Sequence, residues 1–214
     1  VGGDIFFTDF YGCGRGIVVA VIDCTGHGVP GAFMTMIASS GLRRIIRDEG
    51  CHDPAEILKR LNFIVKTTLR QDTADSPSDD GLDAAVCFIP DQKPEAVCTD
   101  IFPGASVPSQ LIFAGARLPL FYILNDEMKV IKGDRQSIGY KRSDINYEFA
   151  NHVIPIKKGT AFYITTDGFT DQLGGERDRR FGSRRFENLL KKNARFPFEK
   201  QREMLIQAFE AYRG

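Results

Sequence analysis

Short apolar stretches bounded by glycine or polar residues occur along this chain together with longer segments whose apolar residues recur at helical spacing. The stretch 17–22 is short, rich in β-branched residues and flanked by glycine on its N-terminal side, which predicts a buried strand. Pro30 fits the first turn of the helix that should follow. A second helix should start where Asp53 can cap it and Pro54 can occupy its first position, and its apolar face extends to about Gln71.

The middle of the chain reads as a polar loop followed by many short strands. The loop covers residues 72–80, and residues 125–127 predict a tight turn within an antiparallel hairpin. Two helices, near 183–192 and 198–212, should close the chain. Because helices early and late with strands between them do not give a βαβ alternation, the pattern predicts an α+β fold of mainly antiparallel sheets covered by helices, with residues 1–214 in one domain. The strand-like segments are 84–89, 95–101, 110–114, 119–124, 128–132, 146–149, 152–156 and 160–166.

Composition narrows the classes of function. The 28 basic and 28 acidic side chains balance, so the electrostatic pattern of a nucleic-acid-binding protein is missing, and no stretch is apolar enough to predict direct membrane contact. The five cysteines form no CxxC pair, which favours reduced thiols and a cytoplasmic location. The three histidines show no metal-ligand spacing, which argues against zinc. The chain begins without an initiator methionine, so we expect a piece of a longer protein, such as the cytosolic output domain of a membrane-anchored sensor.

Three acidic clusters lie beside glycine at the edges of predicted strands, at residues 2–4, 23–28 and 165–171. Asp23 and Asp167 each directly follow an apolar segment that we expect to be a buried strand, which would hold a carboxylate at a rigid strand end. A single Asp-Gly after a strand is more often a simple turn, and spacing alone does not prove that the clusters converge. If they do converge, carboxylate oxygens without His or Cys favour Mg²⁺ or Mn²⁺ over zinc, and the cations would neutralise charges that otherwise repel.

Several motifs in the same order resemble the SpoIIE/RsbU-type bacterial phosphatases, a branch of the metal-dependent PPM phosphatase family. The segment Asp-Cys-Thr-Gly-His-Gly-Val-Pro-Gly-Ala-Phe-Met at 23–34 is similar to the family's signature, and the likeness extends over essentially the whole chain. Some of the motifs are similar to those of one subgroup of the family. The other segments that carry the resemblance are 2–4, 80–85, 113–116, 136–139 and 166–175.

The resemblance implies a fold and a chemistry. The fold would be the α-β-β-α sandwich of PPM phosphatases, with a binuclear Mn²⁺ or Mg²⁺ centre at one end. By position, Asp4, Asp23 and Asp167 would be the catalytic metal ligands, with Asp23 bridging both ions, and Cys24 would offer only its backbone carbonyl. A metal-activated water would then attack phosphoserine or phosphothreonine without a covalent intermediate. The implied substrate is a phosphorylated STAS-domain regulator of a partner-switching pathway, and a homodimer is a further possibility that the family allows.

The chain departs from the family pattern near the bridging aspartate. Thr25 stands where many eukaryotic relatives have a proposed general-acid histidine. His27 is a candidate for proton transfer, although a turn histidine bonded to backbone is the interpretation that we prefer. Ala116 occupies a position where some relatives hold a third metal with aspartate, which argues against that third site. Asp83 and Asp171 could be outer ligands or ordinary turn residues.

The chain also stops at Gly214, before the Asp-Asp motif that supplies a further ligand in the family. We therefore expect a truncated domain in which one metal binds weakly. Two other functions stay open: a non-catalytic module that binds metal or a regulator with the same fold, and a hydrolase of small phosphate esters.

Overall fold

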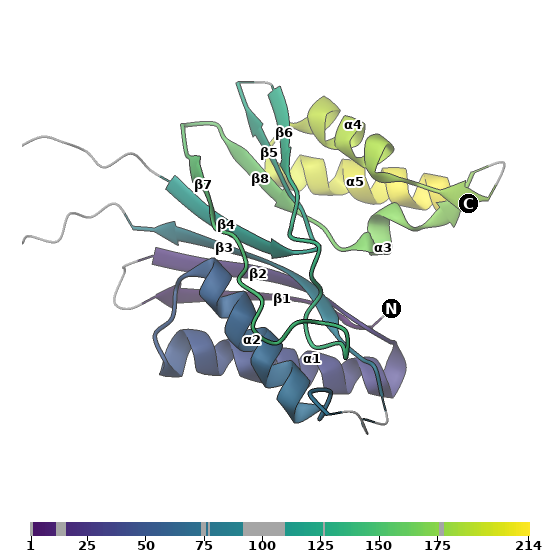
Figure 1. Ribbon diagram of the computed structural model, residues 1–214. Helices are drawn as coiled ribbons and strands as arrows, with labels where there is room; N and C mark the ends of the chain where they lie inside the picture. The colour runs from purple at the N-terminus through teal and green to yellow at the C-terminus, as the bar shows by residue number, and fades with distance from the viewer. Residues whose placement is uncertain are drawn as a thin grey trace, which may run out of the picture. The chain divides into compact units, whose positions relative to one another are not determined.

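The computed structural model describes residues 2–11, 16–73, 76, 78–91, 110–125, 127–175 and 178–214. The chain divides into two compact units, Val1–Leu118 with Lys132–Lys157, and Pro119–Ile131 with Lys158–Gly214. Figure 1 shows the helices and strands of each unit. That residues 1–214 form one domain stays a prediction.

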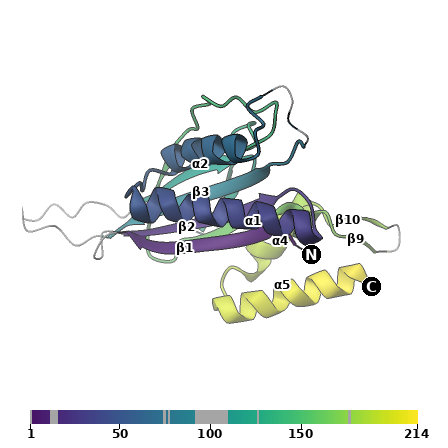
Figure 2. The ribbon, with the colours of Figure 1, turned by 90° about the horizontal axis from the view of Figure 1, so that it is seen from below.

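The first unit contains a five-stranded antiparallel sheet in the order β1-β2-β3-β4-β7. Helices α1 (Gly28–Arg43) and α2 (Pro54–Thr68) cover one face of this sheet (Figures 1 and 2), and a π-helical turn, η1 (Arg44–Asp48), follows α1. The strands are β1 (Asp4–Tyr11), β2 (Gly16–Cys24), β3 (Leu82–Pro90), β4 (Gln110–Ala116) and β7 (His152–Pro155).

The period-two pattern of β2 explains which face meets the helices. Val18, Ala20 and Ile22 are fully buried in the same core as α1 and α2, whereas the residues between them are only half-buried. Alternate side chains of a strand point to opposite faces, so Asp23 lies on the face away from the helices. The predicted strand at 17–22 is therefore confirmed, with one residue more at its start and two at its end.

Helix α2 begins as its sequence predicts. The Asp53 carboxylate accepts a hydrogen bond from the Glu56 backbone N–H at 2.9 Å, and Pro54 occupies the first helical turn. The predicted apolar face is buried against the sheet, where burial of each large aliphatic side chain stabilises the fold by about 1.5–3 kcal/mol. Its fully buried members are Ile57, Leu58, Leu61 and Val65.

The prediction of a strand at 146–149 is wrong. The Tyr147 N–H bonds to the Asp144 carbonyl in a turn, and no described strand covers this segment. The backbone carbonyl groups of the preceding loop accept hydrogen bonds from side chains of α2, not from a neighbouring strand. Lys66, only 4% exposed, donates to the carbonyls of residues 140, 141 and 143 at 2.7, 2.9 and 2.6 Å, and Asn62 donates to the Asp144 carbonyl at 2.9 Å. Phe149 lies in the core and Tyr147 packs against it without strand pairing.

The second unit contains a three-stranded antiparallel sheet in the order β6-β5-β8. The predicted hairpin is confirmed as β5 (Leu120–Leu124) and β6 (Glu127–Ile131), and β8 (Ala161–Ile164) flanks β5. Helices α4 (Ser183–Asn193) and α5 (Phe198–Arg213) lie where the pattern places them. The unit also holds the short α3 (Asp167–Thr170) and a small strand pair, β9 (Leu173–Gly174) with β10 (Arg179–Arg180). Its buried cluster consists of Phe121, Phe181, Phe186 and Leu190.

The predicted α+β class is confirmed. Strand β1 was not predicted, because Thr8 and Asp9 interrupt its apolar pattern. The predicted strand at 95–101 lies outside the described residues. Among the described helices, none is long and apolar enough to cross a bilayer.

Candidate metal-binding and catalytic site

Three aspartates stand in one row across three neighbouring strands of the first unit. Asp4 of β1 pairs in register with Asp23 of β2, and Asp23 pairs in turn with Asp83 of β3. Directly opposed residues of antiparallel strands point to the same face, with Cβ atoms roughly 4.5–5.5 Å apart. The row therefore places three carboxylates on the sheet face opposite α1 and α2.

This row concentrates negative charge. Like charges directly opposite one another destabilise a sheet, and a cation placed between them removes that repulsion. The effect reaches Cys24: burial, together with the charges of Asp23 and Asp4, raises the pKa of its thiol to about 12. A thiol with that pKa stays protonated near neutral pH, so only oxygen donors are offered at this strand end. Oxygen donors of this kind fit Mg²⁺ or Mn²⁺.

The backbone around Gly3 is locked to the end of β2. The Cys24 N–H donates to the Gly3 carbonyl at 3.1 Å, and Gly3 has a φ of +138°. A Cβ at this position would lie 2.7 Å from the Cys24 carbonyl oxygen and 2.9 Å from that of Gly26. Only glycine allows this close approach, which brings Asp4 beside the carbonyl predicted to be a metal ligand.

Thr25 ties the end of β2 to the loop before β3. Its N–H and its hydroxyl both donate to the Gly81 carbonyl at 2.9 Å, and the hydroxyl lies 2.5 Å from that of Tyr140. Burial raises the pKa of Tyr140, so its hydroxyl stays protonated. These contacts give Thr25 a positioning role at the end of β2.

His27 is the N-cap residue of α1 and is exposed. No hydrogen bond of its side chain to any described residue is found, so the preferred interpretation of a turn histidine bonded to backbone is not supported. Its exposure leaves the imidazole open to solvent.

Asp167 occupies a different setting in the second unit. It is the exposed first residue of the single-turn helix α3, and its carbonyl accepts the Asp171 N–H at 2.7 Å. Asp171 forms an ion pair with Arg180 at 2.8 Å, which favours a structural interpretation of this residue. Strand β8 before Asp167 is half-buried, not buried as its apolar sequence suggested.

The structure thus pairs Asp4 with Asp23 and sets Cys24 next to them, whereas Asp167 belongs to the other unit. Among the described residues, no three side chains of His, Cys, Asp or Glu are grouped so that they could hold an ion by themselves. The predicted ligand set also uses the Cys24 carbonyl and Asp167, and it stays a prediction. The alignment of Asp83 with Asp23 was missed, because strand register is not visible in the spacing of the sequence.

The folds of the two units match known protein phosphatases. The SiaA-PP2C domain of Pseudomonas aeruginosa superimposes with a TM-score of 0.80 at 34% identity, covering 100% of this chain and 75% of that one. A serine/threonine phosphatase of S. agalactiae gives a TM-score of 0.63 at 14% identity, covering 100% and 88% of the two chains. RsbX in complex with magnesium gives 0.58 at 16% identity, covering 99% and 80%. The fold is that of the PP2C, or PPM, phosphatases.

The family is shown by sequence as well. The model of the Stage II sporulation protein E (SpoIIE) family matches residues 14–214, so the chain belongs to the SpoIIE family of PPM-type serine/threonine phosphatases. Within the family, the sequence motifs point to SiaA or a near relative, and the structural match to the SiaA-PP2C domain supports that likeness. No curated protein matches the chain in a sequence search.

Proposed function

We propose that the protein is a Mn²⁺- or Mg²⁺-dependent protein phosphatase that hydrolyses phosphoserine or phosphothreonine on a regulatory protein. The observation that carries the proposal is the register pair of Asp4 and Asp23 beside the close approach of Gly3 to the Cys24 carbonyl. Family membership supports the reaction class.

Asp4, Asp23, the carbonyl of Cys24 and Asp167 would hold two cations. When bound, the cations would activate a water for in-line attack on phosphorus and stabilise charge on the phosphoryl oxygens. The Cys24 thiol has no part in this chemistry, because its raised pKa keeps it protonated. Thr25 fixes the direction in which β2 ends through its bonds to Gly81 and Tyr140.

The substrate of the proposed reaction is a phosphorylated STAS-domain regulator, and the pathway is partner switching. The RsbU and RsbW domains of Rv1364c from Mycobacterium tuberculosis, 18% identical to this chain, have a similar fold. A protein substrate would make contacts beyond the phosphoryl group, and such contacts can stabilise the transition state. We further propose a cytoplasmic location and leave open a homodimer.

The test measures phosphate release from a phosphoserine protein by the full-length protein with Mn²⁺, with Mg²⁺ and with excess chelator. Activity should require the metal, and Asp23→Asn should remove nearly all of it. Asp48→Asn is the matched control, because Asp48 is an exposed acidic residue of η1 away from the row. Equal turnover by parent and Asp23→Asn would show that the assignment is wrong.

The same assay separates the alternatives. A non-catalytic module would bind the regulator, measured by calorimetry, without releasing phosphate in either metal. A hydrolase of small esters would favour an aryl phosphate over the phosphoprotein in kcat/KM, whereas the proposed enzyme should show the opposite preference.

A further inference from the structure

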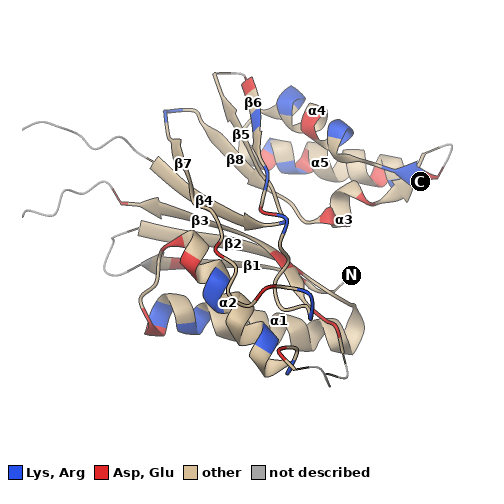
Figure 3. Cartoon of the chain, in the orientation of Figure 1, with Lys and Arg blue, Asp and Glu red and all other residues tan. Residues whose placement is uncertain are grey.

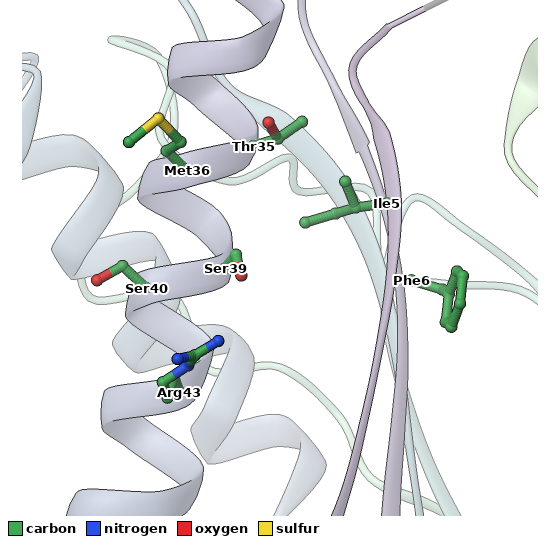
Figure 4. A pocket seen from close by; sticks show the side chains of 7 residues that line it. All are labelled: Ile5, Phe6, Thr35, Met36, Ser39, Ser40 and Arg43. Carbon is green, nitrogen blue, oxygen red and sulfur yellow. The ribbon is translucent and has the colours of Figure 1, made fainter.

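An open groove of about 470 Å³ lies between α1 and the edge of the first sheet. Ile5 and Phe6 of β1 form one wall, and Figure 4 shows residues of α1 along the other. Ile5 points toward the helix and Phe6 points away from it (Figure 4). The residues of α1 that line the groove are Thr35, Met36, Ser39, Ser40 and Arg43.

The β1 wall is the edge strand of its sheet within the described part of the chain. An edge strand presents a row of backbone N–H and C=O groups that another strand can pair with. Phe6 and Phe10 on its helix-free face are each 78% exposed, so this edge carries apolar side chains as well as backbone groups. Proteins normally protect such an edge with short length, charge or proline. Strand β1 spans eight residues without proline, and of its two charged residues Asp9 is neutralised by Arg47.

The α1 wall leaves space for an added strand. Thr35, Ser39 and Arg43 are four residues apart and therefore lie in one line along the helix. Thr35 and Ser39 have small side chains, so they project little from the helix into the groove. The Thr35 hydroxyl donates a hydrogen bond to the Ala32 carbonyl at 2.8 Å. A shallow polar line facing a strand edge suits an extended backbone better than a packed helix.

One charge marks the end of the groove. Arg43 is the only charged residue of α1, which is otherwise free of blue and red in Figure 3. The neighbouring cations are engaged, because Arg44 pairs with Glu49 at 2.9 Å and Arg47 pairs with Asp9. Arg43 is exposed, and its side chain forms no ion pair or hydrogen bond with any residue that the structure describes.

We infer that this groove is a docking site for an extended, acidic segment of a partner protein, which pairs with the edge of β1 and places a carboxylate against Arg43. Pairing of main chains supplies affinity in this mode of recognition, and pockets for alternate side chains supply specificity. Arg43 is the charged residue among those that line the groove, so it is the contact that would select an acidic segment. The inference concerns binding only and does not rest on phosphatase activity.

The test uses a short capped peptide of alternating valine and glutamate, with a matched peptide in which lysine replaces glutamate. Binding is followed by fluorescence anisotropy, and the site is mapped by amide hydrogen exchange of residues 5–10 in metal-free protein. The glutamate peptide should protect these amides and bind about tenfold or more tightly than the lysine peptide, a difference of roughly 1.4 kcal/mol.

Two variants test the walls of the groove. Arg43→Glu should invert the preference between the peptides, while Arg44→Glu, which makes the same charge change one residue away, should leave it in place. Ser39→Phe should fill the groove and abolish binding while the thermal unfolding temperature stays near that of the parent, since Ser39 is only half-buried.

Three results would overturn the inference. Equal affinity for the two peptides would show that the groove does not select an acidic partner. Protection of β1 that appears without peptide and grows with protein concentration would assign the groove to a second copy of the chain. Protection without peptide at every dilution would assign it to a segment of the same chain.

Discussion

Asp23 and Asp167 both lie close to the end of a strand, yet their surroundings differ. Asp23 lies near the end of β2, which has a strand on each side, and the next two residues are bonded to Gly3 and Gly81. Asp167 is exposed at the start of a four-residue helix, after the strand at the edge of a three-stranded sheet. A carboxylate fixed by strand register is positioned in advance, whereas one on a short exposed turn is held mainly by local bonds.

The difference extends to the cores. The first unit has a continuous core formed by α1, α2 and the buried face of its sheet. The second unit has a smaller cluster, and within α5 only Gln201 is buried. We therefore expect substitutions in the first unit to act on stability and geometry together, and substitutions around Asp167 to act mainly on activity.

The largest effect should come from the carboxylates themselves. Asp23→Asn should lower kcat/KM by about 10³-fold, equivalent to about 4 kcal/mol of transition-state stabilisation, and Asp167→Asn should lower it by roughly 10–100-fold. In metal-free protein, Asp23→Asn should leave the unfolding temperature unchanged or raise it, because it relieves repulsion within the row. A larger activity loss for Asp167→Asn than for Asp23→Asn would contradict the expectation that the carboxylate fixed by strand register matters more.

The next effect concerns the close approach at Gly3. Gly3→Ala should destabilise the protein by about 2–3 kcal/mol, because the new Cβ meets two carbonyl oxygens in a backbone conformation that alanine avoids. Gly28→Ala is the control, since Gly28 also has a positive φ, +65°, but open space around it, and about 1 kcal/mol is expected. Urea unfolding measures both, and equal values would show that the contact with Cys24 is unimportant.

A comparable effect should follow from the buried lysine of α2. Lys66→Met should destabilise the first unit by about 2–4 kcal/mol, because three loop carbonyls lose their donor. Lys59→Met removes only an exposed ion pair with Glu148 and should change stability by less than about 1 kcal/mol. Hydrogen exchange should show faster exchange in the first unit and little change in α4 and α5. Uniform acceleration in both units would mean that they unfold together.

The smallest effect should be at Cys24. Cys24→Ser should change kcat/KM by less than about threefold, which corresponds to roughly 0.6 kcal/mol, because the proposed ligand is a carbonyl that serine also provides. A loss as large as that of Asp23→Asn would assign a direct role to the sulfur.

The sequence by itself determined helices α1, α2, α4 and α5, most of the strands, the family and the candidate acidic residues. The Asp53-Pro54 start of α2 and the β-branched alternation of β2 are local signals, so they could be interpreted without the fold. The strand predicted at 146–149 failed because side chains of α2, distant in the sequence, satisfy that loop. Strand β1 was missed because Thr8 and Asp9 interrupt its apolar pattern. Only its pairing with β2 shows that this segment is a strand.

Only the tertiary structure decided which residues share a face and an edge. The row of Asp4, Asp23 and Asp83 depends on strand register, and a shift of one residue would send each carboxylate to the other side of the sheet. The groove beside β1 likewise depends on which strand is left at the edge. Register and strand order are fixed by contacts between distant segments, and for this reason no local pattern in the sequence contains them.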